Sequence, residues 1–252
     1  MLPGLYAAAA GMIAQRERLD VIANNTANLS TTGFKRADPI SRGFYQVFAD
    51  EIARFPALRG SAEIPGGGSS LDLTSEDFSP GPIIDTGNPF DVAIDGSGFF
   101  VVRSPTGERY TRAGNFTLDP EGKLVTQNGY PVLGQGGPII TAGENVQISQ
   151  DGDVLVDGVP AERILLVDFP RPYELLKHGR NLYGIPEYMS RTRAPAADSH
   201  LRVGALEYSN VNPINELTLM MDASRAYETH QRVIQAFDET LNAAVNEIAR
   251  QT

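Results

Sequence analysis

Apolar residues recur every seven positions at both ends of this 252-residue chain. Near the N-terminus the main row is Leu5, Met12 and Leu19, with Ile22 and Leu29 in a companion row. Near the C-terminus the main row is Met220, Tyr227, Ile234, Leu241 and Ile248, with Phe237 in a companion row. A heptad repeat is typical of a helix that packs along a partner helix. The spacing therefore predicts a helix at each end of the chain, and it predicts that the two helices pair.

A cluster of asparagines lies where the N-terminal rows end, and it consists of Asn24, Asn25 and Asn28. Asparagine is a poor helix former because its amide competes for nearby backbone groups. One interpretation is a frayed helix end, with Gly33 beyond it as a left-handed terminator. The other is that the amides hydrogen-bond across packed helices and fix their register. The C-terminal helix has a clearer start, since Asn212 suits the N-cap and a proline follows at the first helical position.

The middle of the chain predicts two further regions. Residues 37–89 are dense in glycine and proline, which predicts an extended connector with one or two short strands. Within it, residues 44–48 fit either a helix or a strand. Over residues 90–203, short apolar runs alternate with turn sequences about every 8 to 12 residues, a pattern typical of an antiparallel sandwich or barrel. The predicted fold class is α+β, with helical segments over 1–36 and 204–252 around a central β domain.

The composition narrows the possible partners and compartments. A formal net charge of −10 argues against nucleic acid or an anionic membrane surface as a partner. The chain has no cysteine, which excludes a disulfide framework and thiolate chemistry. Residues 2–14 resemble the apolar core of a signal peptide, but no basic segment precedes them and no cleavage site follows, so we expect a retained helix. No apolar run approaches the roughly 18 residues of a membrane-spanning helix, so no membrane insertion is expected.

The residues that could carry chemistry do not combine into a catalytic or metal site. The glycines at residues 96–98 lack the third glycine of a dinucleotide-binding motif, and the three histidines are widely dispersed. Asp151, Asp153 and Asp157 resemble a calcium loop, but Leu155 stands where that loop needs an oxygen ligand. We therefore expect neither an enzyme nor a bound cofactor or metal. A secreted adhesin or binding module is an alternative, although it leaves both heptad rows without a role.

Three sequence blocks resemble a known family. Residues 20–35 read DVIANNTANLSTTGFK and resemble the N-terminal signature of the bacterial flagellar rod and hook proteins. Residues 91–100 (DVAIDGSGFF) and 110–116 (YTRAGNF) look like the start of that family's β domain. Residues 204–212 (GALEYSNVN), continuing to 225–228 (RAYE), look like its C-terminal signature. The blocks occur in the family's order and cover both ends and the middle of the chain.

The resemblance implies a structural function. It implies a subunit of the flagellar rod that stacks helically around an export channel and transmits torque from the motor to the hook. The terminal helices would line the inner tube, and their heptad residues and asparagines would contact copies of this chain and other rod subunits. It also implies a periplasmic location and delivery by the flagellar type III export apparatus without a cleaved leader.

The resemblance also bears on which rod protein this is. The length excludes the much longer hook subunit and leaves a proximal or a distal rod subunit. Residues 134–139 (GQGGPI) and 202–207 (RVGALE) look more like the proximal paralogue. We therefore expect a proximal rod subunit, with the distal one as the alternative.

Overall fold

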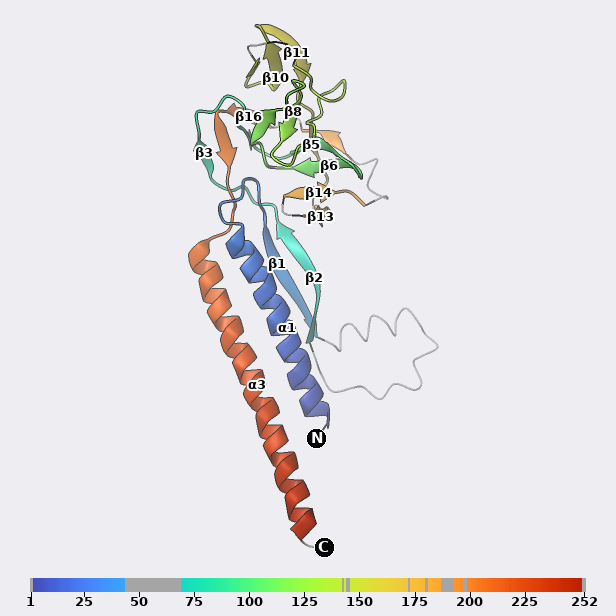
Figure 1. Ribbon diagram of the computed structural model, residues 1–252, viewed down its shortest axis with the longest axis vertical. Helices are drawn as coiled ribbons and strands as arrows, with labels where there is room; N and C mark the ends of the chain where they lie inside the picture. The colour runs from blue at the N-terminus through green and yellow to red at the C-terminus, as the bar shows by residue number, and fades with distance from the viewer. Residues whose placement is uncertain are drawn as a thin grey trace, which may run out of the picture. The chain divides into compact units, whose positions relative to one another are not determined.

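The computed structural model describes residues 2–43, 69–141, 143, 146–171, 173–179, 181–186, 193–196 and 199–250. These residues form an N-terminal and a C-terminal helix, with an antiparallel β region between them in the sequence, so the predicted α+β class is confirmed (Figure 1). The fold divides into two compact units. The helical unit comprises Met1–Ala27, Ala37–Asp77 and Asn212–Thr252, and the β unit comprises Asn28–Arg36 and Phe78–Val211. Within the described residues, no helix is both long enough and apolar enough to span a membrane.

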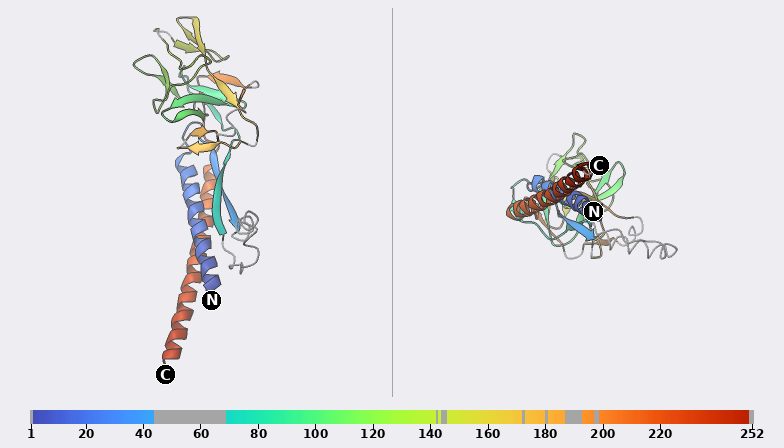
Figure 2. Two further views of the ribbon diagram at one scale, coloured as in Figure 1. Left: turned by 90° about the vertical axis from the view of Figure 1, so that its right-hand side faces the viewer. Right: turned by 90° about the horizontal axis from the view of Figure 1, so that it is seen from below.

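The helical unit is built on two long helices that lie side by side. Helix α1 spans Leu2–Ala27 and helix α3 spans Pro213–Arg250, and Figures 1 and 2 show them alongside each other. As predicted, Asn212 caps α3, because its Oδ1 accepts hydrogen bonds from the backbone N–H groups of Ile214 and Asn215 at 3.0 and 3.3 Å. Strands β1 (Arg36–Gly43) and β2 (Ser69–Asp77) pair with each other and lie along α1. Residues 44–48 lie outside the described residues.

The two helices pair in a single antiparallel register. Gly4 of α1 faces the ring of Phe237, and Gly11 faces the imidazole of His230. Each step forward along α1 is thus matched by an equal step backward along α3, in the heptad spacing that the sequence predicts. The pairing of the two ends of the chain is therefore confirmed within one subunit.

The β unit contains fifteen short strands in the described part of the chain, in a six-stranded sheet and several smaller ones. The six-stranded sheet has the order β13 (Leu176–His178), β14 (Leu182–Gly184), β6 (Gly107–Thr111), β5 (Phe99–Ser104), β12 (Leu166–Asp168) and β15 (Ala194–Pro195). A three-stranded sheet contains β11 (Val159–Arg163), β10 (Asp153–Val156) and β9 (Val146–Ile148). The remaining pairs are β16 (His200–Val203) with β4 (Val92–Asp95), β17 (Ala205–Glu207) with β3 (Ile83–Asp85), and β7 (Phe116–Leu118) with β8 (Leu124–Thr126).

Strand β5 organises the core of the β unit. Its apolar residues are fully buried and alternate between two clusters, because successive side chains of a strand point to opposite faces. Phe100 and Val102 belong to one cluster, with Ile139 and Val154 among others. Phe99 belongs to the second cluster, which is rich in aromatic side chains. A strand buried on both faces explains the uninterrupted apolar run in its sequence.

The unit boundaries differ from the ranges expected from the sequence. Residues 28–36 were expected to continue the N-terminal helical segment, and residues 204–211 to open the C-terminal one, yet both belong to the β unit. The second difference has a clear cause. After β16, Gly204 adopts a φ of 74°, and the chain continues into β17, which pairs with β3 of the β unit. All three residues of β17 are buried.

Candidate functional site

Two glycines of α1 lie where it meets α3, because Gly4 faces Phe237 and Gly11 faces His230. Ala8, Gly11, Ala14 and Ile22 are buried, whereas Leu5, Met12 and Leu19 of the expected main row are only partly buried. The face of α1 that meets α3 is therefore rotated about the helix axis, away from the row of large apolar residues that the sequence predicts. Small residues permit this close approach, and the larger rings of α3 fill the space that they leave.

The remaining candidate residues are distributed over several environments. On α3, Met220, Tyr227, Ile234 and Phe237 are partly buried, and Leu241 is exposed. Ile248 lies on α3, but its side chain is outside the described residues. After α1, Leu29 is partly buried and Asn28 accepts a hydrogen bond from the Thr31 hydroxyl at 3.1 Å, so this turn belongs to the β unit.

Asn25 joins α1 to its two neighbours in the helical unit. Its Oδ1 accepts a hydrogen bond from the backbone N–H of Ala37 at 3.0 Å, and its Nδ2 donates to the carbonyl of Ala37 at 2.9 Å. The same Nδ2 lies 3.3 Å from the Glu216 carboxylate in the first turn of α3. Both Asn25 and Glu216 are fully buried. Asn25 thus fixes the register of α1 against β1 and α3 inside one subunit, whereas Asn24 is exposed.

The close contact between Gly11 of α1 and His230 of α3 yields a first prediction. A Cβ on Gly11 would lie 2.6 Å from the His230 ring, so we expect Gly11→Ala to weaken the helix pair by about 1–3 kcal/mol. In a His230→Ala background the clash is gone, and the same change should stabilise the pair by up to about 1 kcal/mol through helix propensity. Thermal melting followed by far-UV circular dichroism measures both effects. Stabilisation by Gly11→Ala in both backgrounds would contradict the packing described here.

A buried ionic cluster joins distant segments of the β unit. Glu207 Oε1 accepts a hydrogen bond from Lys35 Nζ at 2.7 Å, and Glu207 Oε2 lies 3.3 Å from an Arg112 guanidinium nitrogen. All three side chains are about 5% exposed or less. The backbone N–H of Gly81 also donates to Glu207 Oε1 at 3.0 Å. We call Lys35, Arg112 and Glu207 the buried triad.

Further contacts hold the two cations of the buried triad in place. Lys35 Nζ donates to the carbonyl of Ser79 at 2.7 Å. Arg112 donates to the carbonyl of Gly96 at 2.9 Å, and its guanidinium lies 5.3 Å from the centre of the Phe99 ring. Each charge is therefore hydrogen-bonded, which a buried charge requires. The buried triad thus links the segment after α1, through Lys35, and the segment before α3, through Glu207, to Arg112 in the rest of the β unit.

Gly33 brings the segment after α1 against the β unit. Its backbone N–H donates to the carbonyl of Glu207 at 2.8 Å, and its φ is 65°. A Cβ at this position would lie 2.3 Å from the backbone nitrogen of Ala113. Gly33 does not terminate α1, which ends at Ala27. It is needed because only glycine fits this close backbone approach.

Sequence spacing alone does not single out the residues of these clusters. Lys35, Arg112 and Glu207 each lie inside one of the three family-like blocks, but they follow no periodic pattern. Glu216 lies in the first turn of α3, where a carboxylate is favourable on any helix. Among the described residues, no group of three or more histidines and carboxylates could hold a metal ion. These buried polar contacts can hold segments in register, and they offer no exposed reactive group.

The described residues thus form a helical unit of paired terminal helices and a β unit held together by the buried triad, which is the architecture of a structural protein rather than of a reaction centre. Three family models match the chain. They are the flagella basal body rod protein at residues 5–35, the D1 domain of the flagellar hook protein FlgE/F/G at 93–156, and the flagellar basal body rod FlgEFG protein C-terminal region at 202–247. Each match contains one member of the buried triad.

Curated relatives match over nearly their whole length. The flagellar basal-body rod protein FlgF of Caulobacter vibrioides is 36% identical over 253 residues, which cover 98% of each chain. FlgG of Bacillus subtilis is 36% identical over 265 residues (98% of this chain, 99% of the relative), and FlgG of Buchnera aphidicola subsp. Baizongia pistaciae is 34% identical over 262 residues (96% and 98%). The chain belongs to the flagellar basal-body rod protein family.

Proposed function

We propose that the chain is a structural subunit of the flagellar rod that stacks helically around an export channel and carries torque from the motor to the hook. The observation that supports this proposal most is the joining of all three family segments through the buried triad. A torque-bearing subunit needs such links between its segments, because a loose connection would yield under load. The proposed partners are copies of this chain, other rod subunits and the flagellar export apparatus, and the proposed location is the periplasmic part of the basal body.

The outer faces of the helices supply the proposed subunit contacts. Tyr6 and Ile13 lie seven residues apart on α1 and are 71% and 55% exposed. Ile214 and Met221 repeat this spacing on α3 at 73% and 53% exposure, with Leu217 between them. Large apolar side chains that follow one exposed face of a helix mark an interaction site. We infer that neighbouring subunits cover these rows, and that Leu5, Met12 and Leu19, which the pair leaves partly exposed, contribute to the same contacts.

We further infer that the chain is a rod protein of the FlgF type in the proximal part of the rod. The sequence blocks at 134–139 and 202–207 favour this assignment over a distal subunit. The alignment with FlgF spans 253 residues, close to the 252 of this chain, whereas the two FlgG alignments span 262 and 265 and so require longer gaps in this chain. The alignment with FlgF therefore has fewer gap positions in this chain than either FlgG alignment.

A substitution on the exposed row of α1 tests the proposed assembly. We expect Ile13→Gln to leave the thermal stability of the free chain within about 0.5 kcal/mol of the parent, because the side chain is exposed and glutamine suits a helix. The same variant should enter rods poorly and reduce motility, because it removes an apolar contact between subunits. Immunoblots of purified basal bodies measure incorporation.

Asp238→Gln is the matched control, since Asp238 is exposed on α3 and lies outside the proposed apolar rows. It should be incorporated normally. Normal incorporation of Ile13→Gln would contradict the proposed interface. An adhesin or binding module, the alternative of another class, would be absent from basal bodies altogether.

A further inference from the structure

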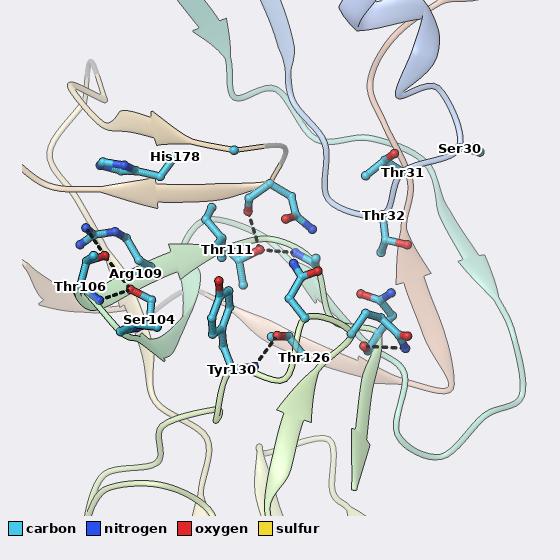
Figure 3. Close-up of a pocket in the computed structure, with 18 residues that line it drawn as sticks. Ser30, Thr31, Thr32, Ser104, Thr106, Arg109, Thr111, Thr126, Tyr130 and His178 are labelled. Carbon is cyan, nitrogen blue, oxygen red and sulfur yellow. Dashed lines mark hydrogen bonds between the residues drawn. The ribbon is translucent and has the colours of Figure 1, made fainter. Parts of the chain in front are cut away.

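The β unit carries a polar groove that the proposed assembly does not use. It has a volume of about 790 Å³ and is lined mainly by segments 30–32, 104–106 and 126–128, with Arg109, Tyr130 and His178. Figure 3 shows Arg109 and His178 on one side and Thr32 on the other, with Tyr130 between them. A groove of this size falls in the range of ligand-binding sites, which runs from about 300 to 1,000 Å³.

The lining of the groove differs in charge from the chain as a whole. None of its 18 described lining residues is an aspartate or a glutamate, although the chain has 31 acidic residues and a net charge of −10. Arg109 supplies a fixed positive charge. Glu108, its neighbour in sequence, is engaged with Arg193 at 2.7 Å. The groove is therefore a local site for a negatively charged group on an otherwise acidic protein.

Hydrogen-bonding groups dominate the rest of the lining. Twelve of the 18 lining residues carry a hydroxyl or a side-chain amide. Some of these groups fix the wall: the Thr111 hydroxyl donates to the carbonyl of Asn181 at 2.7 Å, and Arg109 donates to the Thr106 hydroxyl at 2.9 Å. The side-chain polar atoms of Thr32, Asn128 and Tyr130 make no hydrogen bond within the described part of the chain, which leaves them available to a ligand.

This chemistry favours a carbohydrate over a protein segment. Protein interfaces are built around apolar and aromatic anchors in desolvated pockets, and the groove offers few apolar side chains to form one. A sugar chain presents hydroxyl groups that both donate and accept, which matches hydroxyls and amides in the wall. Tyr130 adds an apolar ring with a polar tip, which suits the mixed surface of a sugar.

We propose that this groove binds an anionic polysaccharide strand. Arg109 receives a carboxylate of the sugar chain, Tyr130 contacts a sugar ring, and Thr32 and Asn128 hydrogen-bond its hydroxyl groups. The residues of the buried triad and of the helix pair take no part in this binding.

Titration of the full-length chain with a short oligogalacturonate, followed by backbone amide chemical shifts, tests the proposal. We expect saturable shifts at residues 30–32 and at Tyr130. Arg109→Gln should weaken binding about tenfold, which corresponds to roughly 1.4 kcal/mol. Arg103→Gln is the matched control, because Arg103 is an exposed arginine on the adjacent strand β5 and does not line the groove. It should bind as the parent does.

Two further probes separate the possible ligand classes. A neutral N-acetylglucosamine oligomer should bind more weakly than the oligogalacturonate, and an aspartate-rich peptide should produce no saturable shifts in the groove. Thr32→Val, which removes one hydroxyl and keeps the shape, should also weaken saccharide binding. The proposal would be overturned by the absence of saturable shifts, by equal binding of Arg109→Gln, or by tighter binding of the peptide.

Discussion

Replacing Glu207 with alanine is expected to destabilise the β unit by about 3–5 kcal/mol. The carboxylate is 1% exposed, and it is shared by Lys35 and Arg112. Its removal leaves two buried cations without their counter-charge and takes the acceptor from the N–H of Gly81. Since domains have a free energy of unfolding of only about 5–15 kcal/mol, this loss is a large share of the total. Rod incorporation should fall with it.

Urea unfolding followed by tyrosine near-UV circular dichroism measures this loss. The chain has no tryptophan, and Tyr110 and Tyr183 are buried in the β unit, so the tyrosine signal reports on that unit. Glu121→Ala is the control, because Glu121 is exposed and its ion pair with Lys123 lies at the surface. It should cost no more than about 1 kcal/mol. A comparable, small loss for Glu207→Ala would show that the buried triad does not hold the segments together.

Gly33→Ala is expected to destabilise the β unit by about 2–5 kcal/mol. The positive φ costs an alanine about 1–2 kcal/mol, and overpacking adds about 1–3 kcal/mol. The overpacking is severe here because the new Cβ would lie 2.3 Å from backbone, which cannot rotate away as a flexible side chain does. The shift would also strain the hydrogen bond from Gly33 N–H to the carbonyl of Glu207.

Gly87→Ala separates the two contributions to the Gly33 effect. Gly87 has a φ of 75°, and a Cβ there would have no heavy atom within 4 Å. This control should show only the conformational cost of about 1–2 kcal/mol in the same urea experiment. Equal losses for Gly33→Ala and Gly87→Ala would indicate that the close approach to Ala113 does not constrain residue 33.

The sequence is sufficient to predict the helices and their pairing, because a heptad repeat is a local signal that survives in any packed helix pair. Asn212 and the following proline likewise mark the start of α3, since capping depends on neighbouring residues only. The repeated turn sequences predict an antiparallel β domain for the same reason. Each of these features is readable within a short window of the chain.

The phase of the helix contact could not be predicted from hydrophobicity. Gly4 and Gly11 carry no apolar side chain, yet they face α3 because the rings of Phe237 and His230 fill the notches they leave. A prediction based on large apolar side chains therefore selects the row of Leu5, Met12 and Leu19, which lies beside the row of Gly4 and Gly11 that faces α3. The side chains of α3 decide which row of α1 packs against it, and they lie more than two hundred residues further along the chain.

The buried triad could not be predicted from spacing either. Its members are separated in the chain by 77 and 95 residues, and a charged residue in a sequence usually indicates a solvated side chain. Only the fold brings Lys35 and Arg112 to the same carboxylate. The resemblance to rod proteins included all three residues in its blocks, but it assigned no contact to them.

Electron cryomicroscopy of purified basal bodies, with a peptide tag inserted at the Asp157–Gly158 turn, tests the central claim most directly. This turn is exposed, and a Cβ on Gly158 would have open space around it, so the β unit should tolerate an insertion. We expect the tag in the outer layer of the proximal rod, with α1 and α3 packed against neighbouring subunits in the inner tube. A tag absent from the rod, or a rod whose inner tube excludes these helices, would contradict the account.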